Sequence, residues 1–123
     1  MTAKKTPKPA PPKGPAAAAY ARLVIYIRNF EAQLDGAHEM AMGFAGSAAG
    51  ILRIEGVGFY DPDILTFYGR DEDGLKTQLV QHVSQLSFIL RAVPKQESEA
   101  PPRRIGFAMQ AGWAGGESGD GSV

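Results

Sequence analysis

The spacing of apolar residues predicts one helix in the first third of the chain. Between Ala16 and Gly36, apolar side chains recur at intervals of three and four positions, so they share one face of a helix. Pro15 is tolerated at a helix start, and Gly36 is typical of a helix end. We therefore expect an amphipathic helix over residues 16–36 that packs one face in the core. That face consists of Tyr20, Leu23, Ile27, Phe30 and Leu34.

Short apolar runs separated by turn residues predict strands after this helix. In the first run, Met40, Met42 and Phe44 would point to one side of a strand. Another run changes phase at Gly56, which predicts a bulge or sharp bend and hence a strongly curved sheet. The runs cover residues 38–45, 51–59, 64–68 and 75–80, with turns expected at 46–50, 61–63 and 70–74.

Residues 78–93 fit two interpretations. Leucines and valines at 79, 83, 86, 90 and 93 have the heptad spacing of a helix. The β-branched residues, two serines and the lack of a helix start signal favour a strand, a short turn at 82–85 and a strand over 87–93. We favour the strands, which Pro94 ends in either case. Residues 103–109 are expected to add one last short strand.

The two ends of the chain have compositions that are unsuited to a core. Residues 1–15 hold five prolines and four lysines, and residues 110–123 are rich in glycine. We expect both ends to be disordered arms around a single domain over residues 16–109. The predicted fold class is α+β, with one helix on a small, bent antiparallel sheet or an Sm-like (SH3-type) barrel.

Charge and cysteine content limit the possible functions. Lys plus Arg and Asp plus Glu number 13 each, so binding to nucleic acid would need a local basic patch. The chain has no cysteine, which excludes disulfides and thiolate metal sites. The basic N-terminus lacks the apolar stretch of a signal peptide, and no segment is long and apolar enough to span a bilayer. We expect a soluble cytoplasmic protein without membrane association.

A few side chains are candidates for binding. His82 stands at a predicted strand end, where it is either a ligand contact or a structural hydrogen-bonding group. Arg103 and Arg104 form a basic pair that either binds phosphate or solvates an edge strand. Trp113 is either inert or a short anchor for a partner. The basic arm adds further phosphate contacts, namely Lys4, Lys5, Lys8 and Lys13.

Acidic residues cluster at two predicted turns, Asp61 with Asp63 and Asp71 with Glu72 and Asp73. Paired carboxylates can hold Mg²⁺ or Ca²⁺ or divide acid and base roles. Turns favour aspartate for backbone reasons alone, and the second cluster lacks the spacing of an EF-hand. No nucleophile motif accompanies either cluster. We therefore expect no catalytic residue, metal site or cofactor.

The order of a helix followed by bent strands resembles the Sm-like fold of the bacterial RNA chaperone Hfq. The resembling residues are Gly50-Ile51, Tyr60-Asp61, Ile64-Leu65, Gly69, His82 and Val93-Pro94. The resemblance implies a ring-forming RNA-binding protein. Two positions depart from that family: Asp63 replaces the aromatic that stacks on a base, and Gln81 replaces the basic residue before the histidine. A carboxylate at the stacking position would repel RNA phosphates, so His82 alone carries over.

A second resemblance covers about residues 18–108. The runs FYGRDEDG, QHVSQLSFILRAVPK and PRRIGF are similar to a small family of uncharacterised bacterial proteins, which implies one domain and no particular activity. We expect a non-enzymatic binding or assembly module that self-associates, with RNA as the first ligand to test. The alternative is a protein–protein adaptor that engages partners through the Pro-rich arm and Trp113. A metal-dependent enzyme using Asp61, Asp63 and His82 is the third interpretation.

Overall fold

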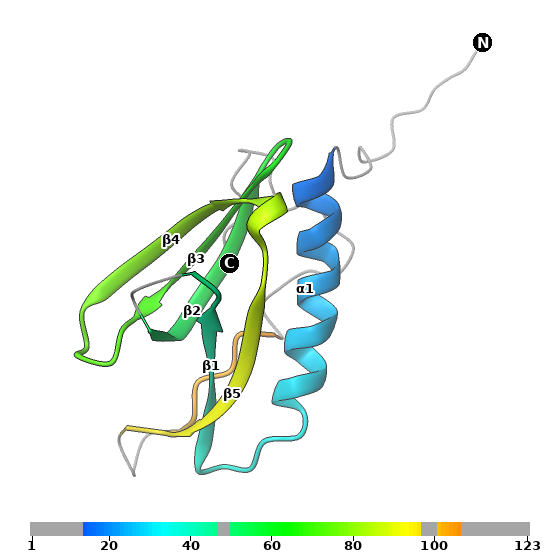
Figure 1. Cartoon of the computed structure of the whole chain (residues 1–123). Helices are drawn as coiled ribbons and strands as arrows, with labels where there is room; N and C mark the ends of the chain where they lie inside the picture. The colour runs from blue at the N-terminus through cyan, green and yellow to red at the C-terminus, as the bar shows by residue number, and fades with distance from the viewer. Residues whose placement is uncertain (1–13, 47–49, 97–100, 107–123) are drawn as a thin grey trace.

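The computed structural model describes residues 14–46, 50–96 and 101–106. One helix is followed by five strands, which form one antiparallel sheet in the order β4-β3-β2-β1-β5 (Figure 1). The helix lies along one side of the curled sheet. This arrangement confirms the predicted α+β class. The elements are α1 (Pro15–Glu31), β1 (His38–Phe44), β2 (Ile51–Tyr60), β3 (Ile64–Arg70), β4 (Lys76–His82), the 3₁₀ turn η2 (Val83–Gln85) and β5 (Phe88–Pro94).

Helix α1 begins where the sequence predicts and ends earlier. Pro15 occupies the first turn, where its missing N–H is not needed. The expected end at Gly36 is wrong, because the helix stops at Glu31. After Glu31 the backbone changes to i→i−3 hydrogen bonds, from the Gln33 N–H to the Phe30 carbonyl and from the Leu34 N–H to the Glu31 carbonyl. Asp35 Oδ1 then accepts a hydrogen bond from the Ala37 N–H at 2.9 Å, forming a local turn that leads the chain into β1.

The core lies between α1 and the inner face of the sheet. Tyr20 of α1 packs on Phe59 of β2, with 5.1 Å between ring centroids. The rings of Phe44 in β1 and Phe67 in β3 lie 4.7 Å apart, although β2 separates their strands. A flat sheet would place these strands about 9–10 Å apart, so the sheet curls strongly around the core. Other buried members are Leu23, Val24, Ile27, Met40, Met42, Leu52, Ile54, Val57 and Leu65.

The predicted irregularity at Gly56 is confirmed as a shift in the pairing of β2 with β3. The register changes between Ile54 and Gly56, which keeps Ile54 and Val57 both buried although they are three residues apart. Opposite the shift, Gly69 lies directly against the Arg53 carbonyl, in a space that a Cβ atom would occupy. Backbone approach of this kind requires glycine.

The two-strand interpretation of residues 78–93 is confirmed. Strand β4 ends at His82, η2 covers Val83–Gln85, and β5 begins at Phe88. In β4 the odd-numbered side chains face the core, whereas in β5 the even-numbered ones do. The turn between the strands causes this change, and it produces a spacing that resembles a heptad. Leu79, Val83, Leu86 and Leu90 therefore all pack against the core from strand–turn–strand geometry.

The expected last strand is wrong for residues 103–106, which run across the end of α1 without pairing as a strand. Side-chain carboxylates take the place of strand carbonyls here. The Glu31 carboxylate accepts hydrogen bonds from the N–H groups of Ile105 (3.1 Å) and Gly106 (2.8 Å), and Glu39 accepts one from Arg103 N–H (2.7 Å). Residues 107–109 lie outside the described residues, as do residues 1–13 of the predicted N-terminal arm (1–15) and the whole predicted C-terminal arm (110–123).

Candidate assembly and binding surface

The sheet has two outer edges that are free within the described part of the chain. Strand β4 pairs with β3 alone and β5 pairs with β1 alone, and each edge is seven residues long. An edge strand presents unpaired N–H and C=O groups to any chain that approaches it. Both strands are therefore places where another strand can add to this sheet.

Each edge carries one large, exposed apolar side chain on the outer face. In β4, Val80 is 58% exposed, and in β5, Ile89 is 50% exposed. The pairing registers place both on the face opposite the core, whereas Leu79 and Leu90 point inward and are partly buried. Each free edge therefore offers another chain both backbone hydrogen-bonding groups and one apolar side chain.

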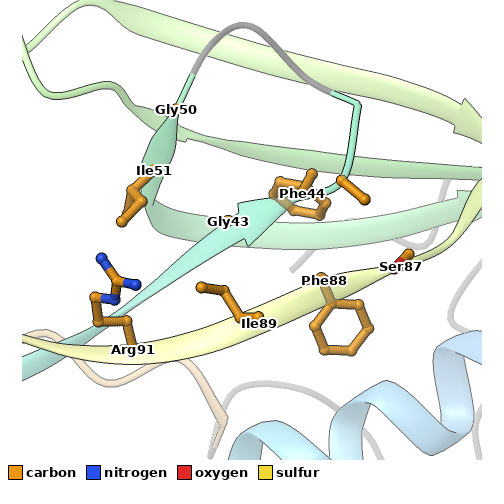
Figure 2. Close-up of a pocket in the computed structure, with 9 residues that line it drawn as sticks. Gly43, Phe44, Gly50, Ile51, Ser87, Phe88, Ile89 and Arg91 are labelled. Carbon is orange, nitrogen blue, oxygen red and sulfur yellow. The ribbon is translucent and has the colours of Figure 1, made fainter.

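A hollow of about 390 Å³ lies on the outer face beside β5 (Figure 2). Gly43 forms its floor, because a Cβ atom there would lie 3.2 Å from Ile89 Cγ1 and 3.6 Å from Ile51 Cγ1. Ile51 and Ile89 stand on either side of Gly43, and the Arg91 side chain extends toward Ile51 at one end. The hollow thus combines an apolar floor and walls with one cation.

A second, more apolar hollow of about 280 Å³ lies between α1 and the start of β5. Ala18 and Ala19 of α1 line it together with Leu86 and Phe88. On the adjoining helix surface, Ile25 is 53% and Tyr26 61% exposed. This flank of the helix is thus a second apolar surface open to a partner.

The predicted ligand residue His82 makes structural contacts. Its Nδ1 accepts a hydrogen bond from the Ser84 N–H at 3.0 Å, so the ring proton resides on Nε2 in the neutral form. Nε2 lies 3.2 Å from Asp63 Oδ2, and the Asp63 carbonyl accepts from the Val83 N–H at 2.8 Å. His82 therefore fastens the β2–β3 turn to the end of β4. Beside it, the Gln81 Oε1 atom is buried without a described partner.

The predicted basic pair also has internal contacts. Arg104 Nη1 donates to the His38 carbonyl at 2.8 Å, and its Nη2 donates to the Asp35 carbonyl at 2.9 Å. Arg103 Nη2 lies 3.8 Å from Glu55 Oε2. A phosphate that bound here would have to compete with these contacts. Lys4, Lys5, Lys8, Lys13 and Trp113 lie outside the described residues.

The acidic turns use their side chains for the backbone. Asp71 Oδ1 accepts hydrogen bonds from the N–H groups of Asp73 (2.9 Å) and Leu75 (2.8 Å), which closes the β3–β4 turn. Over the ranges that the structure describes, no three His, Cys, Asp or Glu side chains gather in a way that could hold a metal ion. Within the same ranges, no helix is long and apolar enough to cross a membrane.

Sequence reasoning missed the roles of Gly43, Val80 and Ile89. Side chains alternate between the two faces of a strand, so the runs KTQLVQH and FILRAVP already indicate that Val80 and Ile89 point away from the face of Leu79 and Leu90. Their position at the sheet edges, however, depends on the pairing of β1 with β5, which local patterns do not specify. Gly43 forms a hollow through neighbours on two other strands.

Comparison with known proteins connects the chain to a single group. Searches of curated proteins and of solved structures each gave no match. A family model described as "Family of unknown function (DUF6173)" matches residues 15–108. The matched range begins at the first residue of α1 and includes every described strand. Because the match covers most of the sequence, the protein belongs to this uncharacterised family, DUF6173.

Proposed function

We propose that the protein is a non-enzymatic module that assembles with copies of itself, with β4 of one copy adding to β5 of the next. The observation that carries this proposal is the pair of free sheet edges, each with one exposed apolar side chain on the same outer face. The two edges differ, so the contact is head-to-tail. Such contacts form a ring if the rotation between copies closes it.

Side-chain phase selects the register of this contact. Outward residues are even-numbered in β4 and odd-numbered in β5, as their pairing with β3 and β1 shows. In an antiparallel contact, residues directly opposite each other lie on the same face of the sheet. Placing Val80 opposite Ile89 also sets the inward Leu79 opposite the inward Leu90. Apolar contact then continues across both faces of the joined sheet.

A register that matches the full length of both strands is disfavoured. It would set Lys76 opposite Pro94 and bring the outward side chains of β4 against inward positions of β5. A shift of one residue exchanges the faces of every side chain, so the buried face fixes the register strongly. The register with Val80 opposite Ile89 is the alternative that preserves both faces with near-complete overlap.

Cysteine cross-linking tests this proposal, because the natural chain contains no cysteine. Two single variants, Val80→Cys and Ile89→Cys, are mixed and oxidised, so any covalent heterodimer joins two different copies. Opposed residues of antiparallel strands have Cα atoms about 4.5–5.5 Å apart, within the range of a disulfide. We expect a heterodimer of Val80→Cys with Ile89→Cys and little of either homodimer.

The controls for this experiment follow from the register. In the control, Arg91→Cys is used in place of Ile89→Cys. Its cysteine lies on the same face of β5 but two residues further along, so it should cross-link to Val80→Cys more slowly. Homodimers in place of the heterodimer would mean a symmetric contact and would contradict the head-to-tail assembly. No covalent dimer at all, from a protein that is monomeric in solution, would contradict self-association itself.

RNA is the first ligand that we propose for the assembled module. The support is the resemblance to the Hfq family together with the lysines at positions 4, 5, 8 and 13. The test is binding of a labelled single-stranded RNA by the full chain and by a chain without residues 1–13. Phosphate contacts require the affinity to fall steeply with salt and to weaken without the arm. Binding that ignores salt and the arm would contradict this ligand.

The apolar hollow beside α1 favours a second candidate, a protein–protein adaptor. Its apolar lining and the exposed Tyr26 would suit an apolar side chain of a partner protein, in addition to contacts through the Pro-rich arm and Trp113. Loss of partner capture on deletion of residues 1–13 and 110–123, with unchanged RNA binding, would favour the adaptor. Unchanged capture by Tyr26→Ala and by the deletions would exclude it.

A further inference from the structure

The hollow at Gly43 has features that self-assembly does not require. It opens on the outer face of β1, β2 and β5, whereas the proposed assembly uses the backbone edge of β5 and, of the residues that line the hollow, the Ile89 side chain. Its volume of about 390 Å³ is within the range of small-molecule sites. Such sites are lined mainly by apolar groups and have a few polar groups that orient the ligand.

Arg91 is the charged residue among those that line the hollow, and it supplies a cation for an anionic ligand. Asp71 and Glu72 line an adjoining hollow together with Arg91, but the Arg91 guanidinium forms no ion pair with any residue that the structure describes. The neighbouring Arg53, by contrast, lies 3.3 Å from Glu39 Oε1 and donates to the Pro94 carbonyl. As far as the described residues go, Arg91 therefore keeps the donors that a carboxylate accepts in a bidentate pair.

The apolar part of the hollow is adjacent to this cation. Figure 2 shows the Arg91 side chain directed toward Ile51, with Ile89 on the other side of Gly43. Ser87, which directly precedes β5, lies at the other end of the lining from Arg91. An occupant that satisfies both parts needs a carboxylate at Arg91 and a hydrocarbon chain that lies along β5 over Gly43.

We propose that this hollow binds a small aliphatic carboxylate, with the carboxylate on Arg91 and the hydrocarbon chain between Ile51 and Ile89. Substitution at Gly43 would fill the floor, because even a methyl group there meets Ile89 at 3.2 Å. The lining residues all belong to one copy of the chain, although Ile89 also takes part in the proposed contact between copies.

The experiment is a titration of the full ¹⁵N-labelled chain with octanoate, octanamide and octylamine, followed by amide chemical shifts. We expect saturable shifts for octanoate at Gly43, Ile51 and Ile89. Octylamine should bind at least about tenfold more weakly, because a charge-assisted hydrogen bond is replaced by repulsion from Arg91. The affinity for octanamide should lie between those for octanoate and octylamine.

Two variants and a matched control complete the test. Arg91→Gln should weaken octanoate about tenfold and leave octanamide nearly unchanged, whereas Gly43→Ala should weaken both. Arg22→Gln removes an exposed arginine on α1 and should change neither. The proposal is overturned if octanoate and octylamine bind equally well, or if Arg91→Gln leaves the affinity for octanoate unchanged. It is also overturned if octanoate causes no saturable shifts, or if the shifts occur at Ala18 and Leu23. A monomeric mass in solution would contradict the assembly and leave this site standing.

Discussion

Replacement of Val80 by lysine tests the proposed contact between copies. Val80 is 58% and Ile89 50% exposed in one copy, so about half of each side chain is left to bury on assembly. Full burial of a branched aliphatic side chain contributes about 1.5–3 kcal/mol, so burying half of each gives roughly 1.5–3 kcal/mol for the pair. The lysine stem retains part of the contact, so we expect Val80→Lys to weaken each junction by about 2 kcal/mol.

A loss of about 2 kcal/mol raises the dissociation constant of the junction about 30-fold. Sedimentation velocity over a range of protein concentrations measures this constant. Ile25→Lys is the matched control, because Ile25 is a 53% exposed aliphatic residue that receives the same charge and belongs to helix α1, not to an edge strand. If Val80→Lys and Ile25→Lys have the same effect, or if Val80→Lys changes the constant less than threefold, the reasoning about this junction is refuted.

Three further predictions concern the fold of one copy. Gly69→Ala should lower the free energy of unfolding by more than about 2 kcal/mol, measured by chemical denaturation, because the new Cβ atom would meet the Arg53 carbonyl. The control Gly36→Ala has open space around it and should leave this free energy nearly unchanged. Burial raises the pKa of Tyr20 from 10.0 to about 12. Arg28 opposes this shift, and Tyr68 adds a smaller contribution to it. Because this folded-state pKa lies above the unfolded value, stability should be unaffected below pH 10 and fall by about 2–3 kcal/mol as pH rises toward 12, and Tyr20→Phe should abolish that part of the loss. Glu31→Ala should free residues 101–106 for faster proteolysis and destabilise the protein by about 2–4 kcal/mol, whereas Glu31→Gln, which still accepts one hydrogen bond, should have a smaller effect.

Local patterns in the sequence predict the parts of this fold that depend on neighbouring residues. The apolar face of α1, the inward methionines of β1 and the irregularity at Gly56 all follow from side-chain spacing. The turn closed by Asp71 follows from the preference of aspartate for bonding local N–H groups. The turn that Asp35 forms between α1 and β1 is also local, although the sequence prediction placed the helix end at Gly36.

Contacts between distant residues account for what the sequence did not predict. The expected strand at 103–109 fails at Ile105 and Gly106, because their N–H groups bond to a carboxylate more than 70 positions earlier. The free edges appear only once β5 is paired with β1 rather than with β4. The hollow likewise needs Ile51 and Ile89 on either side of Gly43, and these come from separate strands. Spacing along the chain carries no information on which strands become neighbours.

The mass of the purified full chain in solution tests self-assembly most directly. Light scattering coupled to size-exclusion chromatography gives this mass, and the ratio of absorbance at the nucleic-acid and protein maxima gives any bound RNA. Head-to-tail addition of β4 to β5 predicts a stable species at a multiple of 13.1 kDa that shifts toward lower mass in Val80→Lys. A single peak at 13.1 kDa over the whole concentration range would contradict the proposed assembly.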